Sequence, residues 1–168
     1  MPKRILGINP GNVHIGYALL QSSELRYWGV KNVAGKWSGE KKEKIEREYL
    51  TLLYKFRPDY VALKKLHSGR SSPELREMVE NLKEVCRIRQ IPVYEYPIQY
   101  VENIILLDKM SKEKLMDTMT EVYPILFREA EKERVRFKRK RTQVEFYYTW
   151  MFEAVALAHV CFNQIDNH

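Results

Sequence analysis

A run of basic residues, RVRFKRKR at positions 134–141, is the clearest charge signal in this chain. Six cations surround Val135 and Phe137, a composition suited to neutralising phosphate groups. An aromatic ring among cations can also stack on an unpaired base. The same run is compatible with a solvated charged loop or a helix extension. The candidate nucleic-acid contacts here are Arg134, Arg136, Phe137, Lys138, Arg139, Lys140 and Arg141.

A second basic segment, KKLHSGR at positions 64–70, follows an apolar stretch that is typical of a strand. Its glycine and serines predict a loop, in which Lys65 and Arg70 offer a smaller basic rim. His67 can stack weakly on a base and can hydrogen-bond a phosphate. A lone histidine is also compatible with an ordinary loop residue.

Charge and composition narrow the class of protein. The 168 residues include 29 Lys and Arg against 22 Asp and Glu, which gives a formal charge of +7 and favours a polyanionic partner. The hydrophobic content of 45% supports one compact α/β domain. No apolar run approaches the roughly 20 residues needed to span a bilayer, and the first residues predict a strand rather than a signal peptide. We therefore expect a soluble, cytoplasmic protein.

The two cysteines, Cys86 and Cys161, lie in apolar helical patterns without CxxC or Cys/His spacing. This placement favours two buried, reduced core residues and neither a zinc site nor a disulfide. The motifs of serine hydrolases, P-loop and dinucleotide-binding proteins and zincin proteases are also missing from the sequence.

Hydrophobic periodicity predicts strands first and helices later. The first three strands follow one another without a helix, so they predict an antiparallel set, and the later alternation predicts crossover units. Strands are expected at 4–9, 15–21, 24–33, 59–66 and 93–97, and helices at 40–56, 73–90, from about 111, and at 142–163. The final helix is apolar on more than one face. The order β-β-β-α-β-α-β-α-α predicts a mixed five-stranded sheet with helices on both faces.

The segment RILGINPGNVHIGYALL, residues 4–20, resembles the opening hairpin of the RuvC-type Holliday junction resolvases, whose pattern reads I-L-G-I-D-P-G followed by G-Y. RPDYVALKKL resembles the family's fourth strand, IPVYEYPIQYV its fifth strand and following turn, MSKEKLMDTM the next helix and FEAVALAHV the closing helix. Residues from about 127 to 145 have no obvious counterpart. The resemblance implies a single RNase H-like domain over residues 1–168 and a role in DNA recombination.

In that family, four acidic positions hold two divalent cations about 4 Å apart. The matching positions here are Asn9, Lys64, Trp150 and Glu153, of which only Glu153 is acidic. One carboxylate and one amide are a poor ligand set for Mg²⁺ or Mn²⁺, so we expect no metal cofactor. Lys64 could instead pair with Glu153. Taken singly, Asn9 is compatible with a turn residue, and Lys64 and Glu153 with solvated charges.

The leading hypothesis is a non-catalytic RuvC-like protein that recognises branched, four-way-junction DNA as a homodimer, with the helix at 74–90 near the dimer axis. A second hypothesis is an interaction or scaffold module that binds a protein partner or RNA. The third is a divergent metal-dependent junction endonuclease, which would need Mg²⁺ or Mn²⁺. Its metal ligands would be Glu153 and other acids such as Asp108, Asp117, Glu145 or Asp166.

Overall fold

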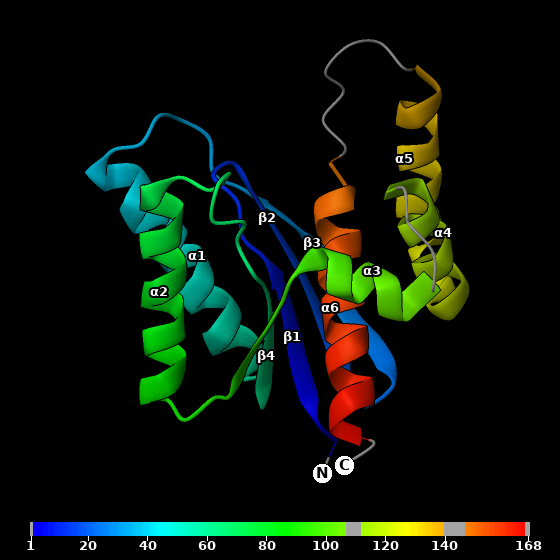
Figure 1. Cartoon of the computed structure of the whole chain (residues 1–168), viewed down its shortest axis with the longest axis horizontal. Coiled ribbons are helices and arrows are strands. Elements are labelled where there is room, and N and C mark those ends of the chain that lie inside the picture. Colours follow the sequence, from blue (N-terminus) through cyan, green and yellow to red (C-terminus); the bar gives the residue numbers. More distant parts are fainter. Residues whose placement is uncertain (1, 107–111, 140–146, 167–168) are drawn as a thin grey trace.

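The computed structural model describes residues 2–106, 112–139 and 147–166, and within these ranges the side chains of residues 106, 112 and 136–139 are not described. The described residues form a five-stranded mixed sheet in the order β3-β2-β1-β4-β5 (Figure 1). The strands are β1 (Arg4–Asn9), β2 (His14–Gln21), β3 (Glu24–Asn32), β4 (Tyr60–Lys64) and β5 (Val93–Tyr96). The first three strands are antiparallel, and β4 and β5 run parallel to β1.

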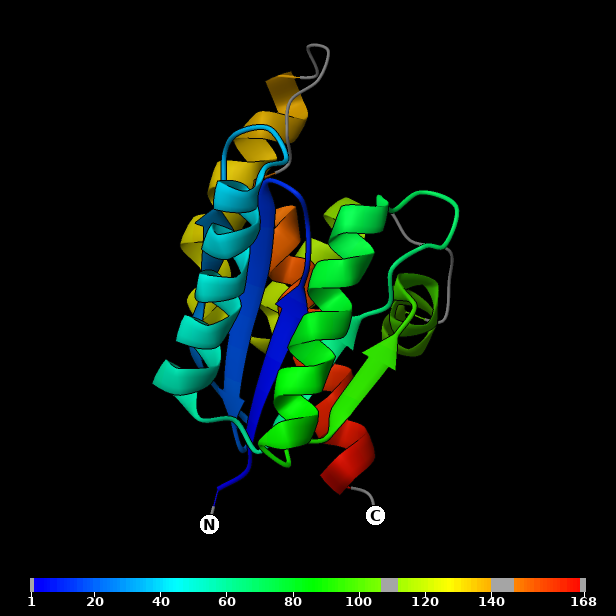
Figure 2. The ribbon, with the colours of Figure 1, turned by 90° about the vertical axis from the view of Figure 1, so that its left-hand side faces the viewer.

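Helices cover both faces of this sheet. They are α1 (Gly39–Phe56), α2 (Pro73–Ile88), α3 (Ile98–Leu106), α4 (Lys112–Val122), α5 (Phe127–Arg139) and α6 (Thr149–Asp166), with a short 3-10 helix η1 (Pro124–Leu126). Figure 2 shows α1 and α2 side by side in front of one face of the sheet, whereas α6 lies behind it. The mixed sheet and its two helical layers confirm the expected α/β class. Among the described residues, no helix has the length and apolar character needed to cross a membrane.

The alternation of side chains along each strand divides the core into two layers. In β1, Leu6 and Ile8 pack with α1 and α2, whereas Ile5 packs with α6 on the other face. In β4, Leu63 faces α1 and α2, and Ala62 faces α6. This parity directs Asn9 and Lys64, each at the last position of its strand, toward the face that α6 covers.

Close approach of α6 to the sheet depends on glycine in β1 and β2. A Cβ atom on Gly16 would lie 2.0 Å from the carbonyl oxygen of Trp150, and one on Gly7 would lie 2.1 Å from that of Ala154. These distances are far below van der Waals contact, so the helix backbone rests directly on the two strands. Ten residues of α6 are buried, including the whole run 151–158, which confirms that this helix is apolar on more than one face.

Two helices differ from the expected order. Residues 98–106 form α3 where the sequence predicts a turn, because Ile98, Val101 and Ile105 recur on one face and pack against the α6 core. Residues 127–139 form α5, although this stretch shows little apolar periodicity because it contributes few apolar side chains to the core. The final helix begins at Thr149 rather than at 142, and residues 142–146 lie outside the described ranges.

Candidate functional site

Three of the four predicted site residues converge at one end of the sheet. Ile8 of β1 pairs with Leu63 of β4, so Asn9 and Lys64 follow at the same end of adjacent parallel strands. Glu153 comes from the first turns of α6, which packs over this end of β1 and β2. The strand register and the helix position therefore bring these side chains together from distant parts of the sequence.

One carboxylate oxygen of Glu153 organises the group. The Nδ2 of Asn9 donates a hydrogen bond of 2.6 Å to Oε2 of Glu153, and the Nζ of Lys64 lies 3.1 Å from the same oxygen. Asn9 is fully buried, Glu153 is 3% exposed, and the Lys64 side chain is 25% exposed. The predicted pair between Lys64 and Glu153 is confirmed, with the ammonium group at the edge of the interior.

This donor set does not fit a pair of divalent cations. Hard cations require several anionic or carbonyl oxygens that are free to donate electron pairs. Here the Oε2 of Glu153 accepts hydrogen bonds from an amide and from an ammonium group, and the positive charge of Lys64 repels a cation at short range. Asn9 Oδ1 is buried without a hydrogen-bond partner among the described residues. This single amide oxygen is not enough to hold a divalent cation, which needs several oxygen ligands.

The other acids considered as ligands lie elsewhere. Asp117 forms an ion pair with Arg134 at 2.9 Å, and Asp166 is the last residue of α6, at the opposite end of the helix from Glu153. Asp108 and Glu145 lie outside the described ranges. Within the ranges that are described, no three His, Cys, Asp or Glu side chains are grouped so that they could hold a metal ion.

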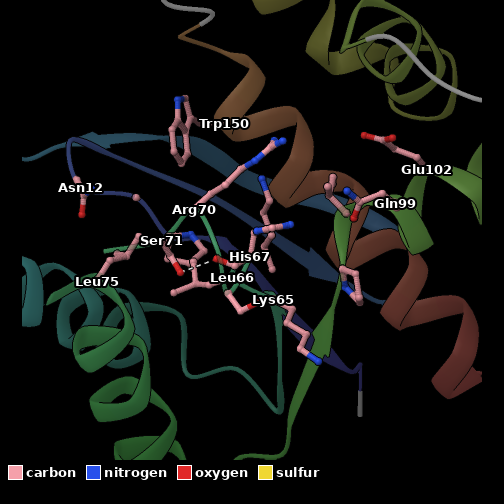
Figure 3. Close-up of a pocket in the computed structure, with 16 residues that line it drawn as sticks. Asn12, Lys65, Leu66, His67, Arg70, Ser71, Leu75, Gln99, Glu102 and Trp150 are labelled. Carbon is pink, nitrogen blue, oxygen red and sulfur yellow. Dashed lines mark hydrogen bonds between the residues drawn. The ribbon is translucent and has the colours of Figure 1, made fainter. Parts of the chain in front are cut away.

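A cleft of about 720 Å³ opens next to this cluster, and Lys64 belongs to both. It lies between the hairpin turn after β1, the loop after β4 and the start of α3 (Figure 3). Its wall carries four basic or imidazole side chains, Lys64, Lys65, His67 and Arg70. Glu102 of α3 is the carboxylate among the described lining residues. The predicted basic rim around His67 therefore lines a real concavity with an excess of positive charge.

The loop after β4 is ordered by its own hydrogen bonds. The backbone N–H of Gly69 donates to Nδ1 of His67 at 3.1 Å, and the Ser71 hydroxyl donates to the His67 carbonyl oxygen at 2.7 Å. The hydroxyl of Ser72 then accepts from the Leu75 N–H, which caps α2. His67 thus shapes the loop while its ring remains exposed to the cleft.

Trp150, the fourth predicted position, lines the cleft and is not paired with Glu153 through its side chain. Its indole packs against the turn after β1, where a Cβ atom on Gly11 would lie 2.6 Å from the Trp150 Cη2. The ring of His14 is tilted by 59° against the indole, with its centroid 5.9 Å from that of the indole. Gly11 therefore leaves room for a large ring next to the metal-ligand positions that the resemblance implies.

The α5 helix supports the start of α6. The backbone N–H of Tyr148 donates a hydrogen bond of 3.0 Å to Oε1 of Glu133, a fully buried carboxylate. Trp28 of β3 donates from its indole nitrogen to Oε1 of Glu129 at 3.0 Å. These two links hold α5 against the sheet and orient the turn that precedes Trp150. Neither acid stood out in the sequence, because buried carboxylates have no local signature in a polar helix.

The basic run at 134–141 is only partly described. Residues 134–139 are the C-terminal part of α5, and Figure 1 shows this end of α5 and the loop after β4 at the same end of the molecule. Arg134 forms ion pairs with Asp117 and Glu131, which leaves it less available to a phosphate. Outside the described side chains lie Arg136, Phe137, Lys138, Arg139, Lys140 and Arg141.

Sequence reasoning missed the contribution of α3 to the cleft. The lining includes Ile98, Gln99 and Glu102, which come from the stretch expected to be a turn. The spacing of Ile98, Val101 and Ile105 is the signal that could have revealed this helix.

Comparison with known proteins supports the architecture. No family model matches the chain. The sequence is 33% identical over 105 residues to the crossover junction endodeoxyribonuclease RuvC of Synechococcus sp. (strain RCC307). This match covers 56% of the chain and 66% of that relative, just under two thirds of its length.

Two solved structures cover nearly the whole chain. Thermus thermophilus RuvC in complex with a Holliday junction substrate has a TM-score of 0.67 and 18% identity, and the match covers 97% of this chain and 96% of that one. The yeast mitochondrial Holliday junction resolvase Ydc2 has a TM-score of 0.63 and 16% identity, with coverage of 99% and 81%. The chain is therefore similar to RuvC in sequence, and its sheet order and two helical layers give it the RuvC-type RNase H-like fold of these structures.

Proposed function

We propose that this protein recognises branched, four-way-junction DNA through shape and charge, without a metal cofactor and without cutting the DNA. The observation that carries the proposal is the arrangement around Glu153, where an ammonium and an amide group donate to the carboxylate. In a metal-dependent nuclease, cations stabilise the attacking and leaving oxygens. An internal hydrogen-bonded cluster cannot supply that chemistry, but it preserves the fold around a basic cleft.

The basic cleft supports the choice of DNA as partner. Lys65 and Arg70 line it, and among the described residues neither has a carboxylate within ion-pair distance. Such unneutralised cations gain free energy when they bind phosphates, because counterions are released. The Thermus thermophilus RuvC structure described above carries a Holliday junction substrate, which makes a branched DNA the natural first candidate.

A homodimer would suit a branched partner, since a four-way junction can present two-fold symmetry and two copies would offer two clefts. We place α2 near the dimer axis, with residues 1–168 acting as one domain. Sedimentation equilibrium should give twice the chain mass of 20.1 kDa at micromolar concentrations. A mass of 20.1 kDa for the free protein, and a single copy of the chain on each junction, would contradict the dimer.

A native-gel competition tests the proposed recognition. Labelled four-way junction is mixed with the protein in EDTA and moderate salt, and a large excess of unlabelled linear duplex is added. A complex that survives the competitor supports metal-free, structure-selective binding. Loss of the complex to duplex would overturn the proposal and leave generic basic binding, which would favour the hypothesis of an RNA or protein partner.

Charge-neutralising variants locate the binding surface. The double change Lys65→Gln and Arg70→Gln should weaken junction binding and flatten its salt dependence. Lys44→Gln with Arg47→Gln removes the same charge from α1, none of whose residues lines the cleft, and serves as the matched control. Equal losses in both double variants would mean that net charge alone drives binding.

A separate set of charge-neutralising variants tests the basic run at 134–141. Neutral residues in place of Arg136, Lys138, Arg139 and Lys140 should also abolish junction binding if this run contacts phosphate. Unchanged affinity would remove the run from the interface and leave the cleft as the binding surface.

A cleavage assay separates recognition from chemistry. The junction is incubated with the wild-type protein in Mg²⁺ or in Mn²⁺, and the strands are resolved on a denaturing gel. Intact strands are expected because the ligand set around Glu153 does not fit divalent cations. Products cut near the branch point would contradict the non-catalytic reading and favour the divergent endonuclease.

A further inference from the structure

The orientation of Trp150 suggests what enters the cleft. The edge of its indole lies against Gly11, the ring of His14 lies 5.9 Å away between centroids, and the residue is partly exposed where it lines the cleft. The ring is therefore fixed before any ligand arrives, which lowers the entropic cost of stacking on it. An aromatic face that is fixed at the wall of a polar cleft suits a flat, unpaired base.

Cations face this ring across the cleft. Figure 3 shows Arg70 and His67 between Trp150 and Lys65 along the cleft, with the Lys65 side chain extending away from Trp150. Deeper in the cleft, the Lys64 ammonium group has three N–H donors and gives one to Glu153. Its remaining donors can bind a phosphate oxygen, while the exposed guanidinium of Arg70 binds a second one.

The size of the cleft matches one nucleotide rather than a duplex. A volume of about 720 Å³ lies within the usual range of roughly 300–1,000 Å³ for small-ligand sites. A duplex is too wide for such a cleft, and its bases are stacked on one another. A nucleotide that has left its pair can place its base and its phosphate in the cleft together.

We propose that the cleft captures a single unpaired nucleotide, with its base stacked on Trp150 and its phosphate bound by Lys64 and Arg70. This inference rests on the proposed function, because it names the part of a branched DNA that the cleft holds. Lys64 then replaces a metal ion as the positive charge that meets the phosphate. Recognition is tolerant of base identity, because every base has a face that can stack.

Photo-cross-linking tests the inference at the level of one residue. A four-way junction that carries one unpaired 5-iodouracil at the branch point is irradiated with the protein, and the adduct is mapped by mass spectrometry. An adduct on Trp150 is the expected result. Junction binding without an adduct on Trp150 would overturn the inference and leave the proposed function standing. No binding of the junction would overturn the proposed function, and the same assay with an eight-nucleotide oligothymidylate that carries one 5-iodouracil still decides the inference.

Affinity measurements provide an independent readout. Trp150→Leu should weaken binding of oligothymidylate and of the bulged junction by about 5- to 150-fold, the range for loss of one stacked base. Trp150→Phe should retain most of the affinity, and binding to fully paired linear duplex should not change. Trp37→Leu, which alters a tryptophan that does not line the cleft, is the matched control. Equal losses for paired and unpaired DNA in Trp150→Leu would contradict base capture.

Discussion

Asn9 donates a hydrogen bond of 2.6 Å from its Nδ2 atom to Oε2 of Glu153, between the end of β1 and the buried face of α6. The resemblance to RuvC-type resolvases places an aspartate at this position. Two carboxylates at this distance would repel each other with only Lys64 to offset their two negative charges, whereas an amide donates to the remaining carboxylate. The difference between Asn and Asp thus decides whether the cluster is stable without metal.

Asn9→Asp should destabilise the protein by about 1–3 kcal/mol at neutral pH, because it replaces a buried hydrogen bond with a repulsive pair. The repulsion raises the pKa of one carboxyl group in the folded state. The free energy of unfolding of the variant should therefore fall further below that of wild type as the pH rises above about 4, and the difference should shrink below that pH. Urea unfolding of both proteins at pH 7.5 and 4.5 measures this. An equal deficit at the two values would contradict the carboxylate pair.

Lys64→Met should cost about 1–3 kcal/mol, because it leaves the nearly buried Glu153 without its cation. This destabilisation is smaller than the cost of breaking a fully buried ion pair, since Lys64 is partly exposed and Asn9 still donates to the carboxylate. Adding Glu153→Gln should recover part of the loss. Urea midpoints of both single variants and the double variant give the coupling between the two residues. Additive effects would mean that the pair contributes nothing.

Gly16→Ala should destabilise the fold by at least 1–3 kcal/mol, roughly the cost of overpacking a core, because the added methyl group collides with the α6 backbone. Gly39→Ala is the control, since nothing lies within 4 Å of a Cβ there and alanine favours a helix by up to about 1 kcal/mol. Thermal unfolding should separate the two variants. Similar melting temperatures would show that α6 can move away from β2 at little cost.

His159 should make stability depend on pH. Burial lowers the pKa of this histidine below its usual 6.5, and its Nδ1 lies 2.8 Å from the Tyr123 hydroxyl. The unfolded chain takes up a proton at a higher pH than the folded chain. The contribution of neutral, buried His159 to the free energy of unfolding is therefore complete above pH 6.5 and is lost as the pH falls below this value. Urea unfolding at pH 7.5 and 5.5 should show that the free energy of unfolding drops less between the two pH values for His159→Gln than for wild type. Equal drops would contradict a role for His159.

Both cysteines should be unreactive in the native protein. Burial raises the pKa of the Cys86 and Cys161 thiols to about 11, so little thiolate exists at pH 8. A disulfide reagent such as dithionitrobenzoate should label neither cysteine within minutes, and both after denaturation in guanidinium. Rapid labelling of the native protein would show that the core opens around α2 or α6.

Local pattern was sufficient to predict the strands and several of the helices. The first strand, Arg4–Asn9, lies where the sequence predicts it, and the helix expected at 40–56 is α1, in which Ile45, Tyr49, Leu52 and Phe56 are buried. The cap of α2 is a local feature too, because Ser72 and the Leu75 N–H from which it accepts are neighbours in the chain. In contrast, α3 and α5 escaped prediction, since the first is short and the second is mostly polar.

What the sequence by itself determined is therefore the two-residue alternation of the strands, the apolar helices and the choice of Asn9, Lys64 and Glu153 as neighbours. That choice followed from a resemblance, and strand parity explains it physically. Only the tertiary structure decided that both donors meet one oxygen of Glu153, that α3 completes the cleft and that Trp150 turns its ring toward it. These features depend on contacts between segments more than 50 residues apart, which no local pattern encodes.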